Sequence, residues 1–222
     1  MGDTPEALWT TFLQINARHV SGATSQFSRN RRSGYCAPAA CAAGAQWHTG
    51  PMQNLILVAV VEPVTDGHVF PREDWPLHIT LVRFDVKPDL ASDGDGGGEA
   101  ELTDRIARLI ERPVQAALGT RLTIGADAGF GRLGSTPVSL VEPDRTLQEL
   151  HESLMKAVAE LHGRVPTPQH TLANYRPHVS HRGDKRVKPG DAVVLDRIAL
   201  VDMAPDGNHS VRRVLRLWEP TK

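Results

Sequence analysis

After residue 51, short apolar runs and alternating apolar and polar positions recur along the chain, and these patterns predict strands. Such runs indicate β-strands when they span about four to eight residues between turn-forming residues. In LHITLV (residues 77–82), Leu77, Ile79 and Leu81 occupy one face, and His78 and Thr80 occupy the other. The predicted strands cover residues 55–61, 77–84, 121–131, 136–143, 177–181, 192–201 and 211–218.

Two longer segments place apolar residues at helical spacing. The first, residues 101–118, follows a glycine-rich loop and contains Pro113, which we expect to bend or end the helix. The second, residues 144–163, has the stronger pattern, and Asp144 is expected to cap its first turn. Its apolar stripe consists of Leu147, Leu150, Leu154, Val158 and Leu161.

The order of these elements predicts the fold class. Two helices among a surplus of strands do not match the strand-helix alternation of a doubly wound parallel sheet. We therefore expect an α+β fold with two antiparallel sheets, each backed by a helix. Residues 1–51 are rich in Ala, Ser, Arg and Thr and are expected to be a poorly ordered extension. The natural start is expected at Met52, and residues 52–222 are expected to form the folded domain.

Composition narrows the range of functions. The chain has 222 residues, a net charge of −1 and a pI of about 6.8, which excludes a general basic field for long nucleic acid. Cys36 and Cys41 lack a second pair for a zinc site and are not expected to form a disulfide framework. The sequence has no apolar run of 18 residues. We expect a monomer in the cytoplasm.

Four histidines are followed two positions later by Ser or Thr: His19, His78, His151 and His178. Residues two apart share a face in a strand but not in a helix. His151 lies in the second predicted helix, so its hydroxyl neighbour points elsewhere and His151 is expected on the surface. His19 ends a doubtful helix in the N-terminal extension, and no role is expected there.

The other two histidines lie in predicted strands with an apolar opposite face. His78 with Thr80 and His178 with Ser180 are 100 residues apart, each pair following a nearby proline in a similar unit, which suggests an internal duplication. They are either ordinary, partly exposed strand residues or two halves of one site. In the second case, two imidazoles with pKa values near 6.5 can supply a general acid and a general base. The hydroxyls can donate to phosphate oxygens.

The segments HITL (78–81) and HVSH (178–181) resemble the paired motifs of the 2H phosphoesterase superfamily, and within it the 2'-5' RNA ligase / RNA 2',3'-cyclic phosphodiesterase group. The resemblance covers about residues 52–218. It implies a bilobal, pseudo-twofold fold with duplicated lobes around a central cleft. The fourth motif position, usually apolar, is Leu81 in the first copy but His181 in the second. We expect His181 to point to the back face beside Val179.

The resemblance implies hydrolysis of 2',3'-cyclic phosphate ends of RNA or small nucleotides to 2'-phosphates. In that case His78 and His178 are the catalytic pair, and Thr80 and Ser180 bind the phosphate. No metal or cofactor is expected. Further candidate substrate contacts are Arg182, Tyr175 and Trp75. The alternatives are a non-catalytic module that binds nucleotides or RNA ends, a 2'-5' RNA ligase, or another cyclic nucleotide phosphodiesterase.

Overall fold

The computed structural model describes residues 52–87 and 98–220. The chain divides into two compact units, Met1–Ala45 and Gln46–Lys222, and every described residue belongs to the second. The expectations about residues 1–51, including the two cysteines, His19 and the start at Met52, therefore lie outside the described residues. Among the described residues, no helix is long and apolar enough to cross a membrane.

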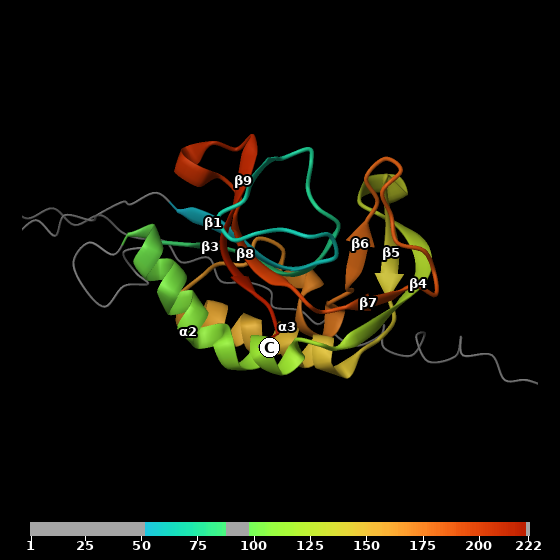
Figure 1. Cartoon of the computed structure of the whole chain (residues 1–222), viewed down its shortest axis with the longest axis horizontal. Helices are drawn as coiled ribbons and strands as arrows, with labels where there is room; N and C mark the ends of the chain where they lie inside the picture. Colours follow the sequence, from blue (N-terminus) through green and yellow to red (C-terminus); the bar gives the residue numbers. More distant parts are fainter. Residues whose placement is uncertain (1–51, 88–97, 221–222) are drawn as a thin grey trace, which may run out of the picture. The chain divides into compact units, whose positions relative to one another are not determined.

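Within the described residues, all paired strands are antiparallel and join in a single series, β2-β9-β8-β1-β3-β6-β5-β4-β7 (Figure 1). The predicted strands are all present, except that the segment 192–201 contains two short strands instead of one. The three-residue strand β2 was not predicted. The strands are β1 (Gln53–Val60), β2 (Val69–Pro71), β3 (His78–Val86), β4 (Arg121–Phe130), β5 (Thr136–Val141), β6 (His178–Ser180), β7 (Ala192–Val194), β8 (Ile198–Asp202) and β9 (Val211–Trp218).

The two described α-helices, α2 (Glu99–Ala117) and α3 (Arg145–Glu160), pack against each other on one face of the sheet (Figure 1). The side chain of Asp144 accepts a hydrogen bond of 2.8 Å from the Leu147 amide, which confirms the predicted N-cap. Helix α2 continues past Pro113, so this proline does not end it. Short 3₁₀ turns are η2 (Arg132–Gly134), η3 (Pro168–His170), η4 (Leu172–Asn174) and η5 (Pro205–Gly207).

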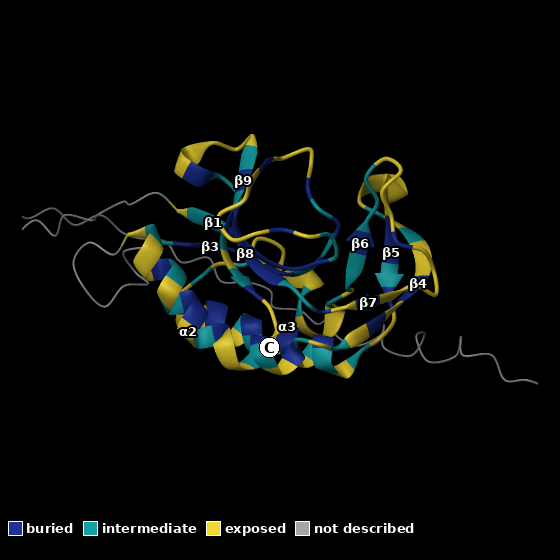
Figure 2. Ribbon diagram, in the orientation of Figure 1, coloured by how far each residue is buried: buried dark blue, intermediate teal, exposed yellow. Residues whose placement is uncertain are grey.

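Apolar residues form a layer on each face of the sheet. The helix-side layer joins Leu55 and Leu57 of β1 to the buried faces of both helices. The outer layer, on the opposite face, includes Val58 and Val60 of β1. Figure 2 shows that each helix is buried only where it faces the sheet. This arrangement follows from the period of two along a strand, which sends successive side chains to opposite layers.

The mixed fold and its antiparallel pairing agree with the prediction, but two separate sheets are not confirmed. The two parts of the sheet connect through β3 and β6, whose pairing consists of Ile79 opposite Val179. Both helices also share one apolar layer instead of backing a sheet each. The sequence pattern could not foresee this connection, because it depends on a contact between segments 100 residues apart.

Candidate active site

The register of β3 and β6 brings both predicted motifs together on one face. Because Ile79 lies opposite Val179, His78 lies opposite Ser180 and Thr80 lies opposite His178. In β1, Val60 and Val58 of the outer layer pair with His78 and Thr80, so this face points away from the helices. Diagonal neighbours on such a face are separated by about 7–8 Å. The histidines form one diagonal and the hydroxyl residues the other.

Each of the two imidazoles is held by the same kind of hydrogen bond, from Nδ1 to a backbone carbonyl oxygen. Nδ1 of His78 lies 2.7 Å from the carbonyl oxygen of Pro76, and Nδ1 of His178 lies 2.8 Å from that of Arg176. A carbonyl oxygen only accepts, so in both rings Nδ1 carries the proton. The Nε2 atom of each neutral ring is therefore the one with a lone pair available to a ligand. In each case, the bonded carbonyl belongs to the residue two positions earlier.

Burial shifts both histidines toward the neutral form. It lowers the pKa of His78 from 6.5 to about 4; the hydrogen bond to Pro76 opposes the shift, and the charges of Arg182 and His178 add to it. Burial also lowers the pKa of His178, with the charge of Arg176 acting in the same direction and the bond to the Arg176 carbonyl against it. Both rings are therefore mainly neutral at pH 7 in the free protein.

A cavity of about 450 Å³ opens beside His178 and Thr80. Among the side chains lining it is Phe130, whose ring centroid lies 4.6 Å from that of His178. The guanidinium of Arg176 lies over the Phe130 ring, 5.0 Å from its centroid. The cavity therefore offers an aromatic and cationic wall next to one of the two free Nε2 atoms. The sequence showed no signal that Phe130 would lie there.

The family model of the 2'-5' RNA ligase superfamily matches residues 59–214, more than half of the chain. The chain belongs to the 2'-5' RNA ligase superfamily. This confirms the resemblance drawn from the paired motifs.

Solved structures with partial likeness to this superfamily member include a phosphoesterase, at 18% identity over 78% of this chain and 100% of that chain, with a TM-score of 0.47. Escherichia coli LigT complexed with 3'-AMP matches at 18% identity over 78% of this chain and 100% of that chain, with a TM-score of 0.45. A protein of Thermus thermophilus matches at 22% identity over 75% of this chain and 97% of that chain, with a TM-score of 0.48. No curated protein matches the chain.

The two aromatic candidates for substrate contacts, Trp75 and Tyr175, pack against other residues of the protein. Trp75 is buried, and its ring centroid lies 4.5 Å from that of His78. The hydroxyl of Tyr175 donates a 2.9 Å hydrogen bond to the Thr80 carbonyl oxygen. Its ring stacks on His151, with centroids 3.9 Å apart and planes at 5°. Both rings thus support the motif strands, and Tyr175 also lines the cavity.

The prediction that His151 lies on the surface was wrong. This side chain is only 1% exposed. Its Nδ1 lies 2.7 Å from the Leu81 carbonyl oxygen, and its Nε2 accepts a 2.9 Å bond from the Leu172 amide. Leu81 lies at a bulge, where β3 has one residue more than β1. The helical spacing itself carried the signal, because position 151 falls on the apolar stripe of α3.

His181 lies on the back face, as expected from the strand period. Its Nε2 is 2.8 Å from the hydroxyl of Ser139, which is fully buried and pairs with Val179. The same hydroxyl donates to Asp127 at 2.8 Å or to the Val187 carbonyl at 3.0 Å. His181 therefore belongs to a polar network behind β6, on the opposite face from His78 and His178.

Arg182 lies near enough to His78 for its charge to lower the pKa of that histidine. Its neighbours in the hairpin after β6 have other partners. Lys185 pairs with Glu62 at 3.3 Å, and Arg186 with Asp127 at 3.5 Å.

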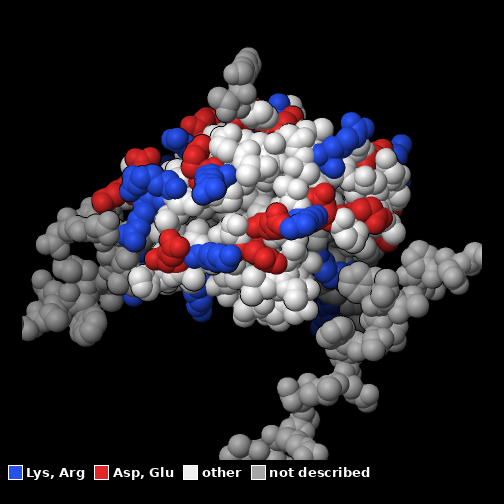
Figure 3. Space-filling view, turned by 90° about the horizontal axis from the view of Figure 1, so that it is seen from below, with Lys and Arg blue, Asp and Glu red and all other residues white. Residues whose placement is uncertain are grey.

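The visible helix face mixes Lys and Arg with Asp and Glu, without a broad patch of one sign (Figure 3). That face therefore offers no extended surface of one charge to a ligand.

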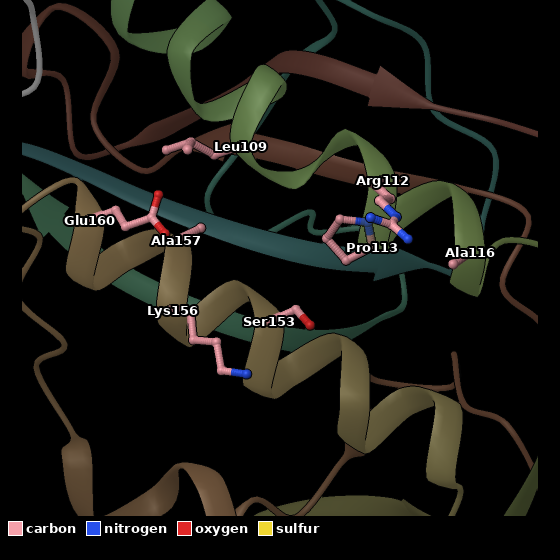
Figure 4. Close-up of a pocket in the computed structure, with 8 residues that line it drawn as sticks. All are labelled: Leu109, Arg112, Pro113, Ala116, Ser153, Lys156, Ala157 and Glu160. Carbon is pink, nitrogen blue, oxygen red and sulfur yellow. The ribbon is translucent and has the colours of Figure 1, made fainter.

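A second hollow, of about 340 Å³, lies between α2 and α3, lined by residues such as Arg112, Ser153 and Glu160 (Figure 4). Its residues come only from the helices, which cover the opposite face of the sheet from the motif histidines. It is therefore unrelated to the candidate site. Within residues 52–87 and 98–220, no three His, Cys, Asp or Glu side chains are gathered in a way that could hold a metal ion.

Proposed function

We propose that this protein is a metal-independent phosphodiesterase that hydrolyses 2',3'-cyclic phosphate ends of RNA or nucleotides to 2'-phosphates, with His78 and His178 as acid and base. One observation carries the proposal. Two imidazoles, each held by a carbonyl at Nδ1, lie diagonally on one sheet face with Nε2 unprotonated in the neutral form. Membership in the 2'-5' RNA ligase superfamily supports a substrate with a phosphodiester.

The reaction requires two proton transfers. One neutral imidazole takes a proton from water, whose oxygen attacks phosphorus; the bond from phosphorus to the 3'-oxygen breaks; and the second, protonated imidazole gives its proton to that oxygen. The products are a 2'-phosphate and a free 3'-hydroxyl. Thr80 and Ser180, on the other diagonal, donate hydrogen bonds to the non-bridging oxygens, where negative charge accumulates. Arg182 supplies positive charge nearby.

The matching histidine geometry also supports the duplicated, bilobal arrangement that the sequence resemblance implies. In both motifs a residue two positions upstream supplies the carbonyl that holds Nδ1. The two motif strands are also neighbours in the middle of the strand series. We propose that the reacting phosphate is contacted from two sides by equivalent histidine and hydroxyl pairs, one from each half of the chain.

We assign the nucleoside to the cavity beside His178. A nucleobase presents a flat aromatic face, and Phe130 and Arg176 offer the partners that such a face favours. Changing Phe130 to Leu removes the aromatic face while it keeps an apolar side chain. The expected result is a rise in KM of about tenfold, as for loss of one stacking contact of about 1–3 kcal/mol, with kcat little changed. An unchanged KM would place the base elsewhere.

The decisive assay uses 2',3'-cyclic mononucleotides and short cyclic-ended RNAs with EDTA present, with products identified by phosphorus NMR. His78→Ala and His178→Ala are each expected to reduce kcat by about 10²–10⁴-fold, because each removes one proton transfer. His209→Ala, at an exposed histidine, is the matched control and should keep full activity. Circular dichroism verifies folding. Full activity in either site variant would refute the mechanism.

A second assay identifies which histidine is the acid. The substrate is a phosphodiester with a 4-nitrophenolate leaving group, which departs without being protonated. Loss of the acid therefore lowers the rate on this substrate little, whereas loss of the base still lowers it strongly. The variant that regains activity on it therefore lacks the acid. If neither variant regains activity, the acid role must be assigned to another group.

Two other functions give distinct results in the same panel. Ligation uses the same ring opening, with the oxygen of a 5'-hydroxyl attacking phosphorus in place of water, and the family name makes it the relevant second activity. It would appear as joining of a 2',3'-cyclic end to a 5'-hydroxyl end. A module that only binds nucleotides would bind these substrates without turning any of them over.

A further inference from the structure

We propose that a basic hollow beside Trp75 binds a second phosphate of the substrate, and that Arg72, Arg182 and Arg212 recognise it. This inference rests on the proposed function, which it narrows to a substrate class. The preferred substrates are nucleotides or RNA ends in which the terminal 2',3'-cyclic nucleotide also carries a 5'-phosphate, either free or linked to the preceding nucleotide.

The hollow has a volume of about 570 Å³. It is one side chain away from the candidate active site, because the Trp75 ring lines it and also lies 4.5 Å from the His78 ring. Three separate segments supply its arginines: the residue after β2, the hairpin after β6, and β9. Its lining consists of Arg72, Glu73, Trp75, Arg182, Met203 and Arg212.

Arg212 provides a fixed, buried positive charge. Only 5% of this residue is exposed, and its Nη1 donates to the carbonyl oxygens of Met203, His209 and Val211. These partners are neutral, so they position the guanidinium without cancelling its charge. Burial lowers the pKa of Arg212, and the charge of Arg72 adds to this effect, while Asp202 opposes it. Arg72 is therefore close enough to be repelled.

The other two arginines have no carboxylate within ion-pair distance among the residues that the structure describes. Of the carboxylates nearby, Glu73 lines the hollow, and Asp202 lies 3.9 Å from the guanidinium of Arg213. Three arginines thus line one concave space, and within the described part of the chain Glu73 is the single acidic residue that lines it with them. A guanidinium matches the oxygens of phosphate in a two-pronged geometry, so the ligand that best relieves the repulsion is a phosphate group.

The chemistry of a nucleotide explains why the hollow is a second site. The reacting phosphate bridges the 2' and 3' oxygens, so it belongs among the motif side chains. The base is attached to the ribose at C1', beside C2'. The 5'-phosphate is attached through C5' to C4', beside C3', on the opposite side of the ring. The cavity beside His178 and the hollow beside Trp75 likewise lie next to different histidines. A base in the former leaves the 5'-phosphate for the latter.

The test is binding and turnover in the full chain with matched ligands. Binding is measured by calorimetry with adenosine 2'-phosphate and adenosine 2',5'-bisphosphate, which resemble the product without and with the second phosphate. Turnover is measured with adenosine 2',3'-cyclic phosphate and its 5'-phosphorylated form. The variant is Arg72→Gln. The control is Arg216→Gln, an exposed arginine on β9 whose cross-strand partner, Leu200, belongs to the helix-side layer.

The wild type and Arg216→Gln should bind the bisphosphate at least tenfold more tightly than the monophosphate, and Arg72→Gln should lose most of this preference. The turnover preference should change in parallel through KM, with kcat on the substrate lacking a 5'-phosphate unchanged. Equal binding of the two ligands by the wild type, or an equal loss for both in Arg72→Gln, overturns the second site. Absence of all turnover, with the binding preference intact, overturns the proposed reaction and leaves the second phosphate site standing.

Discussion

Replacement of His151 by Phe tests how the buried imidazole supports the motif strand. The substitution keeps an aromatic ring to stack on Tyr175 but removes both polar ring atoms. Because Nδ1 contacts a carbonyl oxygen and Nε2 accepts from an amide, the native ring is neutral with its proton on Nδ1. Both of its hydrogen bonds are lost in the variant, while the shape of the side chain is nearly preserved.

The two lost bonds differ in cost. The Leu81 residue is 1% exposed, so its carbonyl oxygen is left without a partner in the core, which costs about 1–3 kcal/mol. Leu172 is 48% exposed, so its amide can turn to water, and the loss there is about 0.5–1.5 kcal/mol. The greater hydrophobicity of Phe offsets part of this sum. We expect the free energy of unfolding to fall by about 2 kcal/mol at pH 7.5.

Urea unfolding followed by circular dichroism measures this change, with His209→Phe at an exposed position as the control. Burial lowers the pKa of His151, so below its ordinary value of 6.5 the unfolded wild type binds a proton that the folded protein does not. The wild type therefore loses stability as the pH falls, by up to about 1.4 kcal/mol per pH unit from this group. The Phe variant lacks that loss, so the stability difference should shrink in acid.

Two results would refute the reasoning. One is a variant as stable as the wild type at pH 7.5, which would mean that neither hydrogen bond contributes. The other is a stability difference that stays constant from pH 7.5 to 5, which would mean that the folded protein protonates His151 as readily as the unfolded chain does.

Three further predictions concern the site itself. The pKa values of His78, at about 4, and of His178 are both lowered, so kcat/KM should be greatest below pH 6.5. It should fall as the pH rises, because the free enzyme loses its protonated histidine. An optimum above pH 7 in a pH-rate profile would contradict this. Tyr175→Phe removes the bond to the Thr80 carbonyl and should cost about 1 kcal/mol in urea unfolding, with a lower kcat and little change in KM. Gly129→Ala places a Cβ 2.9 Å from a backbone oxygen across the turn after β4, so a lower melting temperature is expected in a thermal scan, and an unchanged one would show that the turn yields freely.

The strands and helices were predictable because their patterns are local. A period of two in LHITLV put His78 and Thr80 on the face opposite Ile79, and the structure has this arrangement. The misplacement of His151 had a different origin. Its spacing from Leu147 and Leu154 placed it on the buried stripe, but its polarity suggested the surface. Two backbone partners satisfy the ring, and these come from segments far away in the sequence.

The sequence by itself determined which residues share a face within each strand, because side-chain alternation depends only on neighbouring positions. It also carried the paired motifs by which the family was recognised. Only the tertiary structure decided that Ile79 lies opposite Val179, that both helices cover one face, and that Arg72, Arg182 and Arg212 line one hollow beside Trp75. These are pairings between distant segments, and their register depends on the packing of the whole core, which no local pattern records.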